Sequence, residues 1–524
     1  MNPETKELSF GANAALNVSA WFVPALTALV AVPITVRGLG TDAYGLLTLV
    51  TALTGFLGLI ELGLGTAIVR YLSYYRALDQ GRPMLGIVRF AALWFGVAGV
   101  IGGVVLFVGA QWFAGSLLKV PTEMVPTAVV VLRISALGFF TGMLVSVGSA
   151  IPQSFLRYDL SAVTTIIFGV LGGGGPAVLV ILGFGLKSIV AYGAVANTIA
   201  VATYWLIAVY LFKPIDKTAG PSWSSIRRET LRFAGVAALN QIHSVVALHA
   251  TRIVVGAASG VAAAAHYQVP AMLASRVNNG LQRVAYVIFP TASGMYARDD
   301  AEGVDNLYLR TSRLFFAVNA SVTMAMCALA YPLLAYWVSR EYAREGAVAL
   351  VVFSLASAVN ASTMAASYVN LSAVRPGTNL AFSFTNSVVT LLVVYPLTVR
   401  WGVTGASLAG LLGATNVPVF FWYVHRKILH LSSRRVWREC YRPSLLANVP
   451  LGVVVYFLVA PRTTSLMSAL AAFGCACVLG FVISGLCGAV KREDVRAMVE
   501  LLRVPWRRRG ASETPASGRD GDDS

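Results

Sequence analysis

Two arginines, Arg276 and Arg283, stand seven residues apart in a stretch that is otherwise apolar enough to cross a lipid bilayer. Residues seven apart share one face of a helix, and Asn279 lies between them near the same stripe. A helix rise of 1.5 Å puts Arg276 near mid-depth and Arg283 about 10 Å deeper. Because a guanidinium can chelate phosphate oxygens bidentately, this ladder predicts a site for an anionic group, above all a pyrophosphate.

Other ionisable side chains also interrupt apolar stretches, and each has an ordinary alternative explanation. A charge at the bilayer centre costs roughly 2.5–3.5 kcal/mol on insertion scales, so such groups tend to face a cavity and mark function. Arg133 and Arg252 lie near helix ends, where the favoured alternative is that the side chain snorkels toward the interface. Snorkelling is also a possible explanation for Arg283. A histidine in the core can form hydrogen bonds with a neighbouring helix, and a carboxylate can neutralise an arginine inside the bundle. The remaining candidates are Glu61, Arg133, His243, His249 and Arg252.

The composition places these residues in a membrane protein. Of the 524 residues, 57% are hydrophobic and 12% are charged, and the mean hydropathy is +0.72. A soluble domain carries about 25% charged residues, so this chain could not cover a water-facing surface. Its apolar runs match the roughly 20 residues of a spanning helix and lack the alternation of barrel strands.

Fourteen apolar runs are predicted to cross the membrane as helices, with short connections between them. We therefore expect an all-α polytopic protein with both termini in the cytoplasm. The predicted spans cover residues 10–36, 45–69, 87–110, 126–150, 161–184, 188–212, 234–256, 266–290, 313–338, 346–371, 377–399, 404–425, 445–461 and 465–489.

The 40 Lys and Arg residues are divided unequally between the two sides of these spans. The connections on the side of both termini hold 29, the opposite connections hold 7, and the spans hold 4, with Arg89 and Arg313 at the span edges counted among the connections. The positive-inside rule makes the richer side cytoplasmic. The net charge of +17 then reflects topology and contact with anionic lipid headgroups, rather than nucleic acid.

The chain also repeats itself, which predicts two lobes in the same orientation. FGANAALN (10–17) resembles FAGVAALN (233–240), and the same offset of 223 pairs Tyr44 with Tyr267. GFGLKSIVAYG (183–193) parallels RWGVTGASLAG (400–410) at an offset of 217. In transporters built from repeats, substrate sites lie at the interface of the copies near the midplane.

These patterns divide the chain into lobes, linkers and a tail. We expect an N-lobe of spans 1–6, a C-lobe of spans 7–12, and two further helices outside the repeat. The predicted parts are 1–212 (N-lobe), 213–233 (cytoplasmic linker), 234–425 (C-lobe), 426–444 (basic cytoplasmic loop), 445–489 (spans 13 and 14) and 490–524 (basic, then disordered, tail).

Patterns of catalysis and metal binding are absent from the sequence. It has no G-x-x-x-x-G-K-[ST] for nucleotide phosphates and no cluster of His or carboxylates with metal-ligand spacing. Cys475 and Cys477 lie in an apolar run without such company and are expected to be buried spectators, as are the other three cysteines. We expect neither an enzyme nor a cofactor, but a carrier driven by a gradient or by substrate supply.

Residues 36–73, VRGLGTDAYGLLTLVTALTGFLGLIELGLGTAIVRYLS, resemble the opening signature of Wzx-type polysaccharide-biosynthesis flippases. The matching pattern is R-x-L-G-x-x-x-Y-G followed by D/E-x-G-x-G and V-R-Y. These positions are Arg37, Leu39, Gly40, Tyr44, Gly45, Glu61, Gly63, Gly65, Val69, Arg70 and Tyr71. Such proteins belong to the multidrug/oligosaccharidyl-lipid/polysaccharide (MOP) exporter superfamily, whose two six-helix lobes face each other around a central cavity.

The resemblance implies a flippase of the bacterial inner membrane that moves an undecaprenyl-pyrophosphate-linked oligosaccharide to the outer leaflet. The cavity cations would be Arg276 and Arg283, with Asn279, His243, Arg252 and Arg133 as further substrate-binding candidates. Glu61, with Arg70 as partner, would be the coupling carboxylate, with a proton or sodium gradient left open. Spans 13 and 14 would hold the lipid chain, and polysaccharide polymerase and chain-length machinery are candidate partners.

Two other functions compete with this expectation. A cation-coupled multidrug exporter of the same superfamily would favour an acidic or aromatic cavity, whereas the spans hold four arginines and one glutamate. A membrane polysaccharide polymerase or ligase would need a sizeable external loop with catalytic groups, and the predicted external connections are short.

Overall fold

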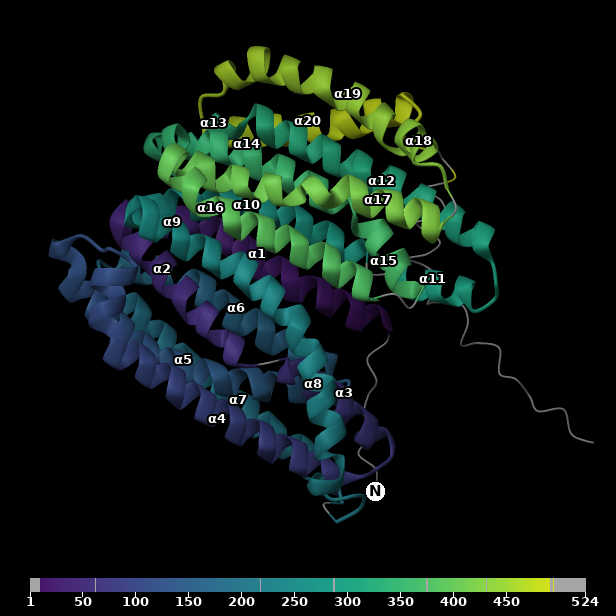
Figure 1. Ribbon diagram of the computed structural model, residues 1–524. Coiled ribbons are helices and arrows are strands. Elements are labelled where there is room, and N and C mark those ends of the chain that lie inside the picture. The colour runs from purple at the N-terminus through teal and green to yellow at the C-terminus, as the bar shows by residue number, and fades with distance from the viewer. Residues whose placement is uncertain are drawn as a thin grey trace, which may run out of the picture.

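The computed structural model describes residues 10–61, 63–216, 218–285, 288–373, 376–429, 431–490 and 493. Helices are the only regular structure in these ranges, and Figure 1 shows them as two bundles with a further helix pair on one side. Many of these helices are long and apolar enough to cross a membrane, so the chain is a multi-pass membrane protein whose helices form two lobes.

The N-lobe contains the first seven helices, three of which (α4, α5 and α7) pack side by side. The helix α1 packs mainly against α6, although Figure 1 shows it lying along the second bundle as well. The helices are α1 (Phe10–Leu39), α2 (Thr41–Leu57), α3 (Leu64–Ala77), α4 (Gly81–Trp112), α5 (Val125–Ser154), α6 (Tyr158–Ile181) and α7 (Leu186–Phe212).

The C-lobe is built around α10, α12, α14 and α16, and it meets the N-lobe chiefly where α2 packs against α9 and α10. Its helices are α8 (Trp223–Val245), α9 (Thr251–Ser259), α10 (Val261–Ala285), α11 (Ile288–Tyr296), α12 (Ala301–Ala328), α13 (Ala330–Trp337), α14 (Arg340–Ser362), α15 (Met364–Ser372), α16 (Pro376–Gly413) and α17 (Val417–Lys427).

Two C-terminal helices, α19 (Arg442–Val454) and α20 (Leu466–Leu486), pack on each other and on α12 of the C-lobe. Figure 1 shows them on the side of that lobe away from the N-lobe. A short helix α18 (Ser433–Val436) and a π-helical turn η6 (Trp437–Tyr441) lead into α19, so part of the predicted loop 426–444 is helical. The predicted linker 213–233 likewise contains the start of α8 at Trp223.

Each of the fourteen predicted spans falls on helix, but several are broken. The predicted span 45–69 is interrupted by the 3-10 turn η1 (Gly58–Glu61) and by Gly63, which is left-handed at φ 66°. The span 313–338 bends by 68° between α12 and α13. Within α16, Trp401 and Gly402 have non-helical dihedral angles, so this element covers one predicted span and the first part of the next, which ends in α17.

By length and apolarity alone, the described residues contain ten helices able to cross a membrane, or eleven with the bent pair counted as one span. The segments α8–α9 and α10–α11 fall outside this set, because they carry the polar residues of the predicted site. The count of fourteen and the cytoplasmic location of the termini stay predictions, and residues 1–9 and 494–524 lie outside the described ranges.

The turns of the two lobes repeat with a constant offset. Gly40 before α2 and Gly260 before α10 have similar dihedral angles, with φ/ψ of 81°/164° and 89°/174°. Asp79 and Asp299 both have positive φ, at 53° and 55°, and the backbone hydrogen bonds around them are the same. Both pairs are 220 residues apart, so the offset of 223 does not extend to Tyr44, whose equivalent is Ala264.

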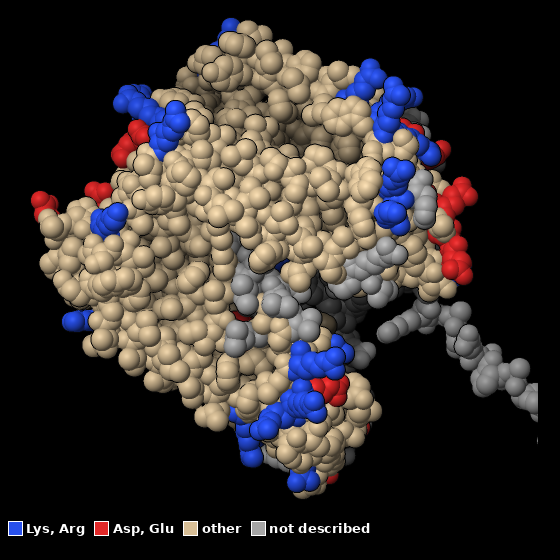
Figure 2. All heavy atoms as spheres, viewed as in Figure 1, with Lys and Arg blue, Asp and Glu red and all other residues tan. Residues whose placement is uncertain are grey.

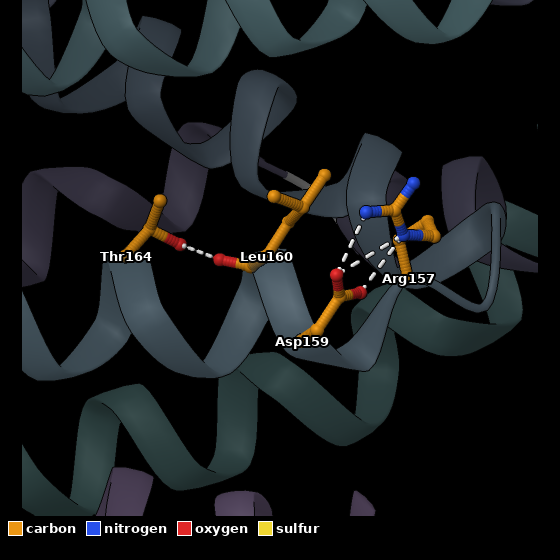
Figure 3. Close-up of polar contacts among 4 residues, drawn as sticks. All are labelled: Arg157, Asp159, Leu160 and Thr164. Atoms are coloured by element: carbon orange, nitrogen blue, oxygen red, sulfur yellow. Dashed lines mark hydrogen bonds and ion pairs between the residues drawn. The ribbon is translucent and has the colours of Figure 1, made fainter. Parts of the chain in front are cut away.

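Charged residues gather at the ends of the helices. Figure 2 shows a broad uncharged band across the molecule, with Lys and Arg around the ends of α4 and α8 and near α17 and α18. The α5–α6 turn is one such end, where Arg157 Nη2 lies 2.7 Å from Asp159 Oδ2 (Figure 3). This distribution matches the predicted cytoplasmic side.

The turn at Gly40 yields a stability test. Only glycine adopts its dihedral angles without strain, so Gly40→Ala should cost about 1–3 kcal/mol and lower the melting temperature in detergent. Gly96→Ala in α4 is the matched control, because a Cβ there would meet no atom within 4 Å. Gly96→Ala should leave the melting temperature unchanged or slightly raised. Equal melting temperatures for the two variants would contradict the strain at Gly40.

Candidate functional site

A cavity of about 670 Å³ lies between the lobes and is lined mainly by α10. Four of its six lining residues, Arg276, Asn279, Gln282 and Arg283, come from the inner half of that helix. Trp21 of α1 and Tyr368 of α15 complete the lining. The structure therefore brings together the three residues that form the predicted cationic stripe.

The cavity side chains combine two cations, two amides and two aromatic rings. The Arg283 guanidinium carbon lies 5.9 Å from the centre of the Trp21 ring, within the range of a cation–π contact. The same ring lies against Gly280, where a Cβ would be in ordinary contact with Trp21 Cη2 at 3.4 Å. Such a lining can bind a phosphate through arginine, hydroxyl groups through the amides, and a sugar face through an aromatic ring.

The sequence did not single out Trp21, Gln282 or Tyr368. Gln282 carried a usable signal, because it lies three residues after Asn279 and so adjoins it on the helix surface. Trp21 and Tyr368 come from helices far away in the sequence, and only the packing of α1 and α15 around α10 brings them to the cavity.

The structure does not place the other predicted cations in this lining. Arg133 is exposed on α5, and its guanidinium carbon lies 5.2 Å from the centre of the Phe107 ring on α4. Arg252 of α9 is half-buried near the outer end of the lobe interface, in the neighbourhood of Tyr44 and Tyr267. His243 lies on α8, but its side chain is outside the described part of the structure.

His249 lies on the π-helical turn η4 (Val246–Ala250) between α8 and α9. Its ring packs against α2, since a Cβ on Gly55 would lie 2.2 Å from His249 Cε1. Its Nδ1 is buried and has no hydrogen-bond partner among the described residues. The histidine thus belongs to the contact between the lobes.

Glu61 ends the turn that breaks the second span, and it is half-buried. A Cβ on Gly65 would lie only 2.5 Å from Glu61 Oε1, so the carboxylate occupies the space that a side chain at 65 would fill. Gly63 supplies the left-handed turn at the start of α3. Two of the glycines around Glu61 therefore have local roles in the turn and in placing the carboxylate.

Arg70 and Tyr71 attach α3 to α8, the helix that follows the linker between the lobes. The Arg70 guanidinium carbon lies 4.2 Å from the centre of the Phe233 ring. Tyr71 packs edge-on against the same ring, and its hydroxyl lies 3.3 Å from Glu229 Oε1. Burial and this carboxylate raise the pKa of Tyr71, so its hydroxyl is the hydrogen-bond donor at neutral pH.

Comparisons with known proteins give this site a context. The sequence profile of a family described as "Polysaccharide biosynthesis protein" matches residues 34–345. A protein of Shigella flexneri named "Putative O-antigen transporter" is 20% identical over 284 residues, which are 54% of this chain and 66% of that protein. The chain thus spans just under two thirds of the length of that relative.

Solved structures with the same fold cover most of the chain. "Lipid II flippase MurJ, inward closed conformation" has a TM-score of 0.68 and 10% identity, and the match covers 91% of this chain and 98% of that one. An inward-facing multidrug resistance MATE family transporter of the MOP superfamily has a TM-score of 0.60 and 19% identity, covering 78% of this chain and 97% of that one. A MOP superfamily transporter from Pyrococcus furiosus has a TM-score of 0.53 and 17% identity, covering 80% and 95%.

The electrostatic potential of the cavity can be tested without knowing its ligand. In a chain whose native cysteines are replaced by serine, Asn279→Cys places a thiol in the lining. In inside-out vesicles it should react faster with an anionic than with a cationic methanethiosulfonate. Adding Arg283→Ala or Arg276→Ala should lower this rate ratio about tenfold, as expected for losing one nearby charge.

Arg133→Ala is the matched control, because it removes the same group from a position outside the cavity lining. It should leave the rate ratio unchanged. A ratio that responds equally to Arg133→Ala and Arg283→Ala, or to none of the three substitutions, would contradict a local cationic site.

Proposed function

Because the chain belongs to the polysaccharide biosynthesis protein family, we propose that it flips a polyprenyl-pyrophosphate-linked oligosaccharide from the inner to the outer leaflet of a bacterial inner membrane. The observation that carries this proposal is the cavity lined by Arg276, Arg283, two amides and two aromatic rings. The two guanidinium groups suit the pyrophosphate, and the remaining lining suits the sugars. The lipid chain would stay in the bilayer while the head group crosses.

The names of similar proteins support the same class of substrate. One relative is named as an O-antigen transporter, and one structural neighbour is named as a lipid II flippase. A multidrug exporter is the competing function, since MATE transporters share the fold. Among the described residues, the lining holds two arginines and no carboxylate, which favours an anionic substrate over a cationic drug.

Helices α19 and α20 are proposed to hold the lipid chain beside the C-lobe. Their outward faces are apolar, with Leu446, Val453, Met467 and Val478 among the exposed side chains. Anionic lipid headgroups would contact the basic ends of the helices. A polymerase and chain-length machinery would receive the flipped product.

Glu61 is proposed to respond to protons during transport, since it is an acid at the break between α2 and α3. Both helices have contacts to the second lobe, α2 through α9 and α10, and α3 through α8. A change of charge at Glu61 can therefore act on the segment that joins both contacts. Arg70, stacked on Phe233, is assigned to the α3–α8 joint rather than to the cavity.

The substrate assignment predicts which arginines transport requires. In cells lacking the polymerase, Arg276→Ala should reduce the lipid-linked sugar that reaches the outer leaflet about tenfold or more, since a charged hydrogen-bond partner of the pyrophosphate is lost. The transport rate of Arg276→Lys should fall between those of Arg276→Ala and wild type, because lysine keeps the charge but cannot form two parallel hydrogen bonds to the phosphate. The measurement is labelling of outer-leaflet sugar by an impermeant reagent.

Arg133→Ala should transport at the wild-type rate with the same amount of folded protein. Full transport by Arg276→Ala would contradict the cavity assignment. Loss of transport in both variants would indicate a general effect of removing membrane arginines.

The position of Glu61 yields a second test of transport. Gly65→Ala should displace the carboxylate and reduce transport, while the melting temperature stays equal or rises, because alanine favours helix. Gly58→Ala is the matched control, since the nearest atom to its Cβ would be Met143 Cε at 4.0 Å. Glu61→Gln should transport at a rate that no longer depends on pH. If Glu61→Gln transports at the full rate and the rate still depends on pH, the proposal that Glu61 titrates during transport is contradicted.

A further inference from the structure

Three polar contacts join the lobes at the outer side of the cavity. Arg37, at the end of α1, donates to the carbonyl oxygens of Val338, Tyr336 and Trp337 at 2.6, 3.0 and 3.1 Å. Trp337 Nε1 donates to the carbonyl of Leu29 in α1 at 2.9 Å. Thr41 Oγ1, at the start of α2, donates to Glu341 Oε1 at 3.1 Å.

The first contact caps a helix end. The last carbonyls of a helix lack internal donors, and α13 ends at Trp337. The 68° bend before α13 turns it away from the line of α12, so its carboxyl end meets the N-lobe. Arg37 is a suitable cap, because a guanidinium can donate to several carbonyls and its charge complements the helix dipole.

The second contact, from Trp337, gives a hydrogen-bond donor to a backbone carbonyl of α1 that lacks one because of a proline. Pro33 lies four residues after Leu29 and has no N–H, so the helical hydrogen bond to the Leu29 carbonyl cannot form. Trp337 of the other lobe supplies the missing donor. Separating the lobes therefore removes the partners of backbone groups on both sides, unless water or other groups replace them.

The lobes also approach each other closely near Arg37, at a glycine of the segment 36–73 that resembles the flippase signature. A Cβ on Gly45 would lie 1.9 Å from the carbonyl oxygen of Val261, so only glycine allows this approach of α2 to α10. Glu341, which accepts from Thr41, also lies 3.4 Å from His266 Nε2 of α10. The two lobes are thus in contact on the outer side, whereas the cavity lies along the inner half of α10.

We propose that Arg37, Thr41, Trp337 and Glu341 form an outer latch, which holds the lobes together on the external side and opens once in every transport cycle. Arg37 acts as a positioning residue, since it sets which side of the cavity is open without lining the cavity. The latch rests on the proposed transport by two moving lobes, but it does not depend on which substrate is carried.

Access to the cavity from outside tests the latch. In intact cells, Asn279→Cys in the cysteine-free chain is exposed to an anionic, impermeant methanethiosulfonate. Arg37→Ala should raise the labelling rate about threefold to tenfold, because losing the cap shifts the lobes toward the outward-open state. Trp337→Phe should act in the same direction, since it keeps an aromatic ring but removes the N–H donor to the Leu29 carbonyl.

Arg344→Ala is the matched control, because Arg344 is an exposed arginine on the same outer side of α14. It should leave the labelling rate unchanged. Equal rates for Arg37→Ala, Trp337→Phe and Arg344→Ala would overturn the latch.

A cross-link provides a test that does not require removing Arg37. Thr41→Cys with Glu341→Cys can be joined by a short bis-methanethiosulfonate, which forms a reducible disulfide with each thiol, since glutamate is too long for a direct disulfide to replace the contact. The cross-link should abolish external labelling of Asn279→Cys and transport, and reduction should restore both. Quantitative cross-linking with unchanged external labelling would overturn the latch. Latch-dependent labelling without sugar transport would contradict only the proposed substrate.

Discussion

Backbone groups inside a bilayer must find partners within the protein, because lipid supplies none. This constraint explains where the two lobes meet. Pro33 deprives the Leu29 carbonyl of its helical donor, and the bend at Leu329 presents the carboxyl end of α13. Both sets of carbonyls are satisfied from the opposite lobe, by Trp337 and by Arg37. The breaks in the helices and the contact between the lobes are therefore one feature of the structure.

The helix α10 serves both sides of the cavity through a change in its composition. Its outer half is VAAAAHYQVP, in which small buried residues such as Ala264 and Ala265 let α2 and α14 approach closely. Its inner half contains Arg276, Asn279 and Arg283, which line the cavity. The first half of α10 thus packs closely against α2 and α14, and its second half lines the cavity with polar side chains.

The sequence predicted the features that depend on local pattern. Apolar length located the helices, and the seven-residue spacing of Arg276 and Arg283 put both arginines in one cavity lining. It could not predict Trp21 and Tyr368, which reach the cavity only through packing between distant helices. It also missed the break at Gly58–Gly63, because a run of Gly, Leu and Ile is equally apolar whether straight or broken. The repeat was recognised but its offset was misjudged, since the positive-φ turns that define it are single residues.

The contact on the outer side combines opposed contributions. Arg37 is exposed, so water competes with the carbonyls it caps and the net contribution of the cap is modest. Arg252 lies half-buried at the same interface, near the phenol groups of Tyr44 and Tyr267 and the imidazole of His249. Removing a guanidinium from water is costly without a carboxylate partner, so opening the lobes would relieve part of that cost. In the proposed transport cycle, a weak cap and a poorly solvated cation would keep the closed and open states close in free energy, as alternation between them requires.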